Sequence, residues 1–200
     1  MPMLTEITAQ PKDEPEIIRR VLSGEVDAYA DIVRSYQGKV LGLCLSFLRN
    51  QTQAEDAAQE IFIKAYQSLD RFRGSSSFST WLYRITANHC KDCLRVQSRH
   101  KTQSLDALTE ELGDAVDGLL RPPLGPAAVS AENSEKIEQI LAQLSPDERM
   151  ILVLREAEGL NYKEIARTLN LSLDAVKARL RRARKTLEQK TRHFLAKAGV

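Results

Sequence analysis

The chain has 200 residues, enough for one large or two small domains. Apolar residues make up 42% of it and charged residues 28%, which excludes a wholly disordered chain and allows a real hydrophobic core. The formal net charge is only +2, but the charge is unevenly distributed. Two segments are basic, 84–101 and 177–192, whereas Thr102 to Glu135 holds seven acids and one base. This asymmetry points to nucleic-acid contact by particular segments.

Nothing near the start resembles a signal peptide, because residues 1–20 are polar and contain three prolines. No apolar run approaches the roughly 20 residues that a membrane-spanning helix needs. Three cysteines do not make a disulfide framework. We therefore expect a cytoplasmic protein with no membrane insertion.

Helical periodicity dominates the N-terminal half. A short helix is expected over 15–22 and a long one over 27–48. Thr52 and Glu55 have the spacing of a capping box, which predicts a helix from there to Leu69. The stretch 71–77 reads as a loop, after which Ser77 or Ser79 is expected to cap a helix that carries Trp81 and Leu94.

The next stretch changes character, because it is rich in proline and glycine and poor in large apolar residues in register. We expect a flexible linker over 97–133, with one weak helical turn near 105–112. Helical periodicity returns at Ile137, and Ser145 followed by Pro146 marks another helix start. No period-2 alternation is visible. The predicted fold is all-α, with two small helical bundles, 15–96 and 134–190, on either side of the linker.

The C-terminal segment 161–187 has the pattern of a helix-turn-helix. Asn161 and Glu164 form a capping box for the first helix, and Ser172 is a good N-cap for the second. The second helix has an apolar stripe and is otherwise rich in lysine and arginine. Such a helix enters the DNA major groove, where cations meet phosphates and base edges. The alternative is a basic helix whose charges are merely solvated.

A second segment, 71–95, combines aromatic residues with cations. Exposed aromatic rings stack on unpaired bases while nearby cations hold the backbone, so this segment is a candidate for single-stranded DNA. The alternative is that Phe78, Trp81 and Leu82 pack the core. For Trp81 alone the two readings are equally balanced.

His89, Cys90 and Cys93 form the one cluster that resembles a metal or redox site. His89 and Cys93 are four residues apart and share a helix face. However, a helical C-x-x-C lacks the usual zinc-knuckle geometry, and no fourth ligand is evident. We therefore expect buried or chance residues here, and neither a metal nor another cofactor.

The helix over 54–66 has a polar edge beside its apolar stripe. Gln59 and Phe62 lie on a shared edge, which suits a partner helix, although such a face is more often simply solvated. No catalytic signature occurs: there is no glycine-rich phosphate loop, no G-x-S-x-G and no H-E-x-x-H. We therefore do not expect an enzyme.

Together, the segments AEDAAQEIFIKAYQSLDRF (54–72), RGSSSFSTWLYRITANHCKDCLR (73–95) and 144–187 resemble a bacterial RNA polymerase sigma factor of the extracytoplasmic-function (ECF) group of the sigma-70 family. The resemblance covers about 22–190 except the linker. It implies a sigma-two-like and a sigma-four-like domain that bind core RNA polymerase, through its β′ coiled coil and β flap, and promoter DNA. It also implies an anti-sigma factor as a further partner.

The resemblance assigns residues to three surfaces. It implies that core polymerase binds Asp56, Gln59, Glu60 and Phe62. The minus-ten element would be captured by Arg73, Ser76, Phe78, Trp81, Arg84 and Asn88. The minus-thirty-five element would be read by Ser172, Lys177, Ala178, Arg179, Arg181 and Arg182.

Two other classes of protein fit parts of the sequence. A stand-alone helix-turn-helix regulator with a helical sensor domain would bind duplex DNA as a dimer and ignore polymerase. A metal- or thiol-sensing protein built around His89, Cys90 and Cys93 would bind metal tightly in its reduced state.

Overall fold

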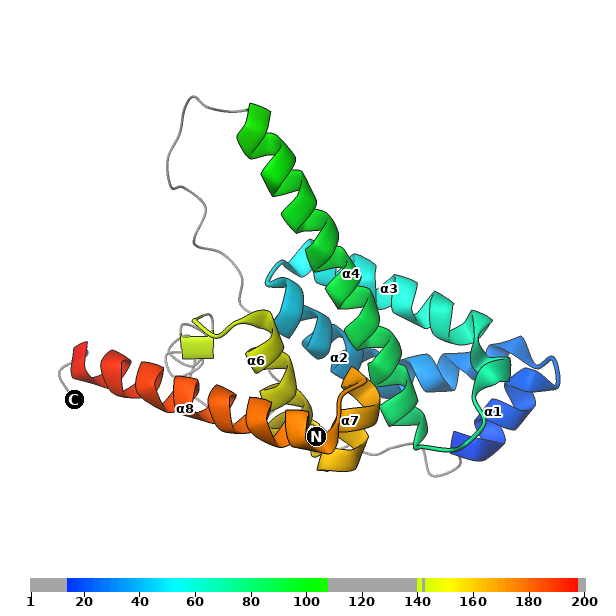
Figure 1. Ribbon diagram of the computed structural model, residues 1–200. Helices are drawn as coiled ribbons and strands as arrows, with labels where there is room; N and C mark the ends of the chain where they lie inside the picture. Colours follow the sequence, from blue (N-terminus) through cyan, green and yellow to red (C-terminus); the bar gives the residue numbers. More distant parts are fainter. Residues whose placement is uncertain (1–13, 108–139, 142, 198–200) are drawn as a thin grey trace, which may run out of the picture.

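The computed structural model describes residues 14–107, 140–141 and 143–197, and within these ranges all regular structure is helical. Figure 1 shows the arrangement, in which the two longest helices, α4 and α8, each extend at their C-terminal end away from the packed centre. In chain order the elements are α1 (Glu14–Leu22), η1 (Val26–Ala28), α2 (Tyr29–Leu48), α3 (Gln51–Gln67), η2 (Leu69–Arg71), α4 (Phe78–Ala107), α6 (Pro146–Leu152), η3 (Val153–Ala157), α7 (Tyr162–Leu169) and α8 (Leu173–Lys197).

The start of α3 differs from the predicted one. The cap is Asn50, whose side chain accepts a hydrogen bond from the Gln53 backbone N–H at 3.0 Å. Thr52 therefore lies inside the helix, and the Thr52–Glu55 capping box is wrong. Asn is as good a cap as Thr, and here it directly follows Arg49, whose positive φ of 54° ends α2.

The helix after the loop begins as predicted at one of the two candidate serines. The Ser77 hydroxyl accepts a hydrogen bond from the Thr80 backbone N–H at 3.2 Å. The helix α4 then continues to Ala107, well into the segment expected to be a linker. The remainder of that segment, and part of the helical turn expected near 105–112, lie outside the described residues.

In the C-terminal half the helices begin at the capping residues predicted from the sequence. Ser145 and Glu148 form a reciprocal capping box with Pro146 in the first turn of α6, and Asn161 and Glu164 form another at α7. Between them, Gly159 adopts a φ of 68°, a left-handed conformation that ends the preceding helix and favours glycine. These caps set α7 and α8 as the two helices of the helix-turn-helix.

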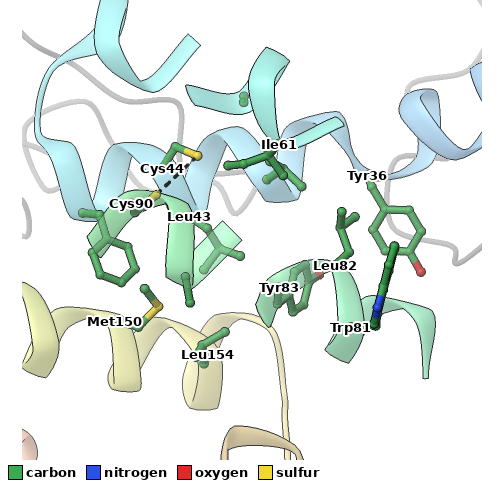
Figure 2. Packing of buried hydrophobic residues seen from close by; sticks show 14 of the residues in the cluster. Tyr36, Leu43, Cys44, Ile61, Trp81, Leu82, Tyr83, Cys90, Met150 and Leu154 are labelled. Carbon is green, nitrogen blue, oxygen red and sulfur yellow. Dashed lines mark hydrogen bonds between the residues drawn. The ribbon is translucent and has the colours of Figure 1, made fainter. Parts of the chain in front are cut away.

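The two halves of the chain share one buried cluster. Helices α2 and α4 of the first half contact α6 and α7 of the second. Met150 and Leu154 point toward the first half, where Leu43 and Tyr83 belong to the same buried cluster (Figure 2). The two expected bundles are thus packed against each other, an arrangement that the sequence did not indicate.

Polar contacts join the halves as well. The Arg149 guanidinium donates to the Ser46 carbonyl oxygen at 2.9 Å, and the Tyr83 hydroxyl donates to the Glu158 carboxylate at 2.5 Å. Both the Tyr83 side chain and Arg149 are buried. The contact between the halves is therefore a core interface and not a loose surface contact.

Candidate nucleic-acid and protein interfaces

The helix α8 is anchored by a narrow apolar face. Val176, Leu180 and Ala183 are buried with at most 1% of their surface exposed, and they pack into the core. The Ser172 hydroxyl accepts a hydrogen bond from the Ala175 backbone N–H at 3.2 Å, which confirms its expected place as the N-cap. This anchoring turns the rest of the helix surface toward solvent.

That solvent-facing surface is cationic. The side chains of Lys177, Arg181, Arg182, Arg184 and Lys185 are exposed along it. Several of them line a groove of about 390 Å³ together with Tyr162, the first residue of α7. A rigid helix with an exposed cationic face suits the phosphate-lined major groove.

Arg179 lies apart from that face. Its guanidinium approaches the Asp147 carboxylate of α6 at 3.6 Å, and its side chain is only 35% exposed. On a helix it falls close to the buried side, beside Val176 and Ala183, because residues three or four apart share a face. In this structure Arg179 therefore lies beside α6, and the DNA contact expected of it stays a prediction.

The aromatic residues around the loop 72–77 are buried, contrary to the reading of exposed stacking platforms. Phe78 is 1% exposed and Trp81 is 7% exposed. Phe78 makes edge or tilted ring contacts at 5.4–5.5 Å with Tyr36, Phe72 and Trp81. Phe78, Trp81 and Tyr36 therefore form part of the core beneath the loop and are not exposed for stacking on a nucleobase, whereas Phe72 is half-buried.

The polar members of the same expected site are accessible. Arg73, Arg84 and Asn88 are exposed, and Ser76 is half-buried. Asn88 lines a groove of about 450 Å³ between the C-terminal end of α3 and the middle of α4. Lys64, Gln67, Ser68, Arg71, Ile85, His89 and Asp92 line it as well.

The helix-turn-helix unit contacts the loop 72–77. Arg167 of α7 donates a hydrogen bond to the Ser75 carbonyl oxygen in the loop at 3.3 Å. Helices α4 and α7 also lie side by side. One of the expected DNA-contacting segments therefore adjoins the domain that carries the other.

The surface of α3 contains most of the expected polymerase-binding residues. Asp56, Gln59 and Glu60 are exposed, whereas Phe62 is only 8% exposed and belongs to the core. Ile63 and Tyr66, which the sequence reasoning missed, are 56% and 40% exposed on the same helix. Apolar side chains left in solvent beside a polar edge are what a protein partner requires. Ile63 lies outside the apolar stripe of α3, which was the available signal, whereas Tyr66 was counted within that stripe and gave none.

The structure separates Cys90 from the other two residues of the His-Cys cluster, His89 and Cys93. The Cys90 thiol faces the Cys44 thiol of α2, with the two sulfur atoms 3.8 Å apart, and both residues are fully buried. His89 instead faces α3, where its Nδ1 lies 2.7 Å from the Lys64 ammonium nitrogen. Cys93 approaches His89 Nε2 at 3.6 Å. The three side chains do not converge on one point.

The different surroundings of His89 and Cys90 also shift their pKa values. Burial, followed by the neighbouring Lys64 ammonium, lowers the pKa of His89 from its usual value of 6.5. The hydrogen bond from Cys90 to Cys44, together with burial, raises the pKa of the Cys90 thiol far above its usual range. A protonated, buried thiol is a poor nucleophile and a poor metal ligand.

No group of three His, Cys, Asp or Glu side chains in the described ranges is placed to hold a metal ion. Among the helices of the described part of the chain, none combines the length and apolarity that a membrane span needs.

Comparison with known proteins places this geometry in a family. The helix-turn-helix with its cationic helix, joined to a second all-helical unit, defines the class as a DNA-binding transcription protein. The family model described as Sigma-70 region 2 matches residues 32–100, and the model described as Sigma-70, region 4 matches residues 134–187.

Curated relatives agree along nearly the whole chain. The chain is 36% identical to the RNA polymerase sigma-H factor of Pseudomonas aeruginosa, over 94% of this chain and 98% of the relative. It is 38% identical to the ECF RNA polymerase sigma factor SigW of Bacillus subtilis, over 88% and 95% of the two chains. The chain therefore belongs to the sigma-70 family of RNA polymerase sigma factors and to its ECF group.

A solved structure has a similar fold. The sigma factor RpoE of Bartonella quintana, crystallised with the anti-sigma factor NepR, matches with a TM-score of 0.64 and 22% identity. The match covers 82% of this chain and 96% of that one. At this identity the likeness concerns the all-helical fold alone.

Proposed function

We propose that this chain is an alternative sigma factor that binds core RNA polymerase and directs promoter-specific initiation. The observation that carries the proposal is the presence, in one member of this family, of a cationic recognition helix and a separate polar and apolar surface on α3. The protein supplies recognition and helps to melt DNA; it is not an enzyme and needs no cofactor. Because its partners in this proposal, core polymerase and promoter DNA, are in the cytoplasm, the protein acts there.

Core polymerase binds the exposed surface of α3. Asp56, Gln59 and Glu60 provide its polar edge, and Ile63 and Tyr66 provide apolar area. Phe62 contributes from below by packing the helix in place. The contact on polymerase is the β′ coiled coil, and the β flap receives the C-terminal domain.

Two segments contact promoter DNA. Arg73, Ser76, Arg84 and Asn88 form the polar part of the minus-ten site, with Phe78 and Trp81 as its packed support. Lys177, Ala178, Arg181 and Arg182 face the minus-thirty-five element, with Arg179 at the edge of this surface beside α6. Ser172 caps the helix that carries them. An anti-sigma factor is a further partner of this proposal.

The experiment that tests the polymerase surface uses exposed residues. Gln59→Ala combined with Ile63→Ala should weaken assembly with core polymerase and leave the helical content unchanged. Phe62→Ala is unsuitable because it removes a buried ring and costs about 3–5 kcal/mol of folding free energy. Lys39→Ala on α2 is the matched control, with assembly expected to stay at the wild-type level.

The result also decides between classes of protein. A stable complex with core polymerase and initiation at specific sites supports the sigma-factor proposal. Tight binding to duplex DNA as a dimer, without any affinity for core polymerase, favours a stand-alone regulator and rejects the sigma-factor proposal.

A further inference from the structure

Two exposed acids, Asp174 and Glu188, lie on the solvent-facing side of the cationic helix, and Asp174 is the one near its N-terminal end. Asp174 lies in the first turn of α8, and its side chain is 94% exposed. Ala178 and Arg181 follow it at spacings of four and seven residues, so the three share one helix face. That face lies opposite the buried residues Val176, Leu180 and Ala183. Asp174 is therefore on the part of the helix that enters the groove first.

A carboxylate at this position opposes non-specific binding. DNA presents phosphates on both sides of the groove, and each negative charge placed between them is repelled. Lys177, whose ammonium nitrogen lies 3.4 Å from the Asp174 carboxylate, offsets this repulsion only in part, since both side chains are exposed. A simpler role is stabilisation of the helix N-terminus, which any acid in the first turn provides.

We infer that Asp174 is a specificity-determining residue of the upstream promoter element, and that it accepts a hydrogen bond from the N4 amino group of a cytosine. The inference rests on the proposed function, because it assumes that α8 occupies the major groove. Among the bases, only cytosine and adenine present an amino donor there. In adenine the acceptor N7 lies beside that donor and repels a carboxylate, so cytosine is the favoured partner.

Two neighbours of Asp174 on the same face, Ala178 and Arg181, have side chains suited to other base contacts. Ala178 has no polar group, but its methyl group suits contact with the methyl group of a thymine. Arg181 presents a guanidinium, whose two-pronged geometry matches the O6 and N7 acceptors of guanine. The face that begins with Asp174 therefore has a donor, an acceptor and an apolar position to match against base edges.

The test uses holoenzyme reconstituted from core polymerase and the full chain. A promoter located with the wild-type protein is randomised in its upstream element, and bound sequences are counted. We expect wild type to select cytosine at one position. Asp174→Ala should abolish that preference, a change of about five- to a hundredfold at that position, while preferences elsewhere persist. Asp174→Asn should move it toward adenine, since an amide pairs with N6 and N7.

A matched control separates base reading from general charge. Glu188→Ala also removes one exposed negative charge from α8, but it lies 14 residues further on, about 21 Å along the axis. Both Ala variants should bind unselected DNA at least as tightly as wild type, and only Asp174→Ala should change sequence preference. If Asp174→Ala leaves every position unchanged, the residue serves the helix terminus alone and the inference is wrong. If wild type itself enriches no sequence, the proposed function fails as well.

Discussion

Arg149 is a charged residue in the interior, only 5% exposed, and one of its hydrogen bonds crosses from the second half of the chain to the first. Its guanidinium donates to the carbonyl oxygens of Leu141 at 2.9 Å, Leu144 at 3.2 Å and Ser46 at 2.9 Å. The side chain therefore fixes the start of α6 against α2.

Replacing this residue should be costly. Arg149→Met keeps the length and the apolar stem but removes every donor, so we expect the free energy of unfolding to fall by on the order of 3 kcal/mol. Chemical denaturation monitored by circular dichroism measures the change. Arg34→Met is the control: Arg34 pairs with Asp31 at the surface, and its loss should cost less than about 1 kcal/mol. Equal effects of the two substitutions would contradict the account of Arg149.

His89 should make stability depend on pH. Its ring faces Lys64 and Glu60 of α3 and Asp92 and Cys93 of its own helix, and burial is the main cause of its lowered pKa. As pH falls below 6.5, the unfolded chain takes up a proton at His89 before the folded chain does. The free energy of unfolding is therefore fully retained above 6.5 and decreases as pH falls through the folded-state pKa.

The measurement compares urea midpoints at pH 7.5 and 5.5 for wild type and His89→Gln. Carboxylates titrate in both proteins and cancel in the comparison, so the variant should lose less stability on acidification. A larger or equal loss in His89→Gln would show that the folded protein does not disfavour the protonated ring.

At the scale of elements, the stability of the helix-turn-helix depends on the residues that cap its helices. Asn161 accepts hydrogen bonds from the backbone N–H groups of Lys163 and Glu164 at 2.9 and 3.0 Å. Asn161→Ala removes both and should cost about 1 kcal/mol. Lys163→Ala, next to it on the surface, should cost only a few tenths. Thermal unfolding of the two variants checks this order, and a reversed order would exclude capping as the source.

Local signals explain which elements were predictable. Ser145, Asn161 and Ser172 were identified as caps because each directly precedes an apolar periodic stretch, and the structure confirms all three. The start of α3 was misplaced because Thr52 and Asn50 satisfy the same local pattern. Only the backbone, which turns at Arg49, decides between them.

The candidate sites were less predictable, because the burial of a side chain depends on contacts with residues far away in the sequence. The sequence around Phe78 and Trp81 is the same whether the rings stack on bases or on each other. Only the packing of Tyr36 against Phe78, and of Phe78 against Trp81, shows which occurs. The contact between Arg179 and Asp147 was unpredictable for a similar reason, since the two residues are on different helices. The exposure of Ile63 and Tyr66 likewise emerged only once the rest of α3 was packed.

At the scale of the whole molecule, the shared core predicts that the two halves unfold together. Leu154 of η3 is completely buried in the cluster that also contains Leu43 and Tyr83. Leu154→Ala should cost about 2–5 kcal/mol and should lower protection from hydrogen exchange in α2 and α4 as well as in α7. Leu173→Ala, at a site that is 41% exposed, is the control and should change little. Loss of protection confined to the C-terminal half would show that the halves are independent.

The central claim is that this chain gives core RNA polymerase its choice of promoter, and transcription of genomic DNA by reconstituted polymerase tests it most directly. Core polymerase alone should start at scattered sites. With the protein added, starts should concentrate downstream of a shared two-part sequence, and Arg181→Ala combined with Arg182→Ala should disperse them while polymerase still binds the protein. Starts that stay scattered in the presence of a stable protein–polymerase complex would contradict the account.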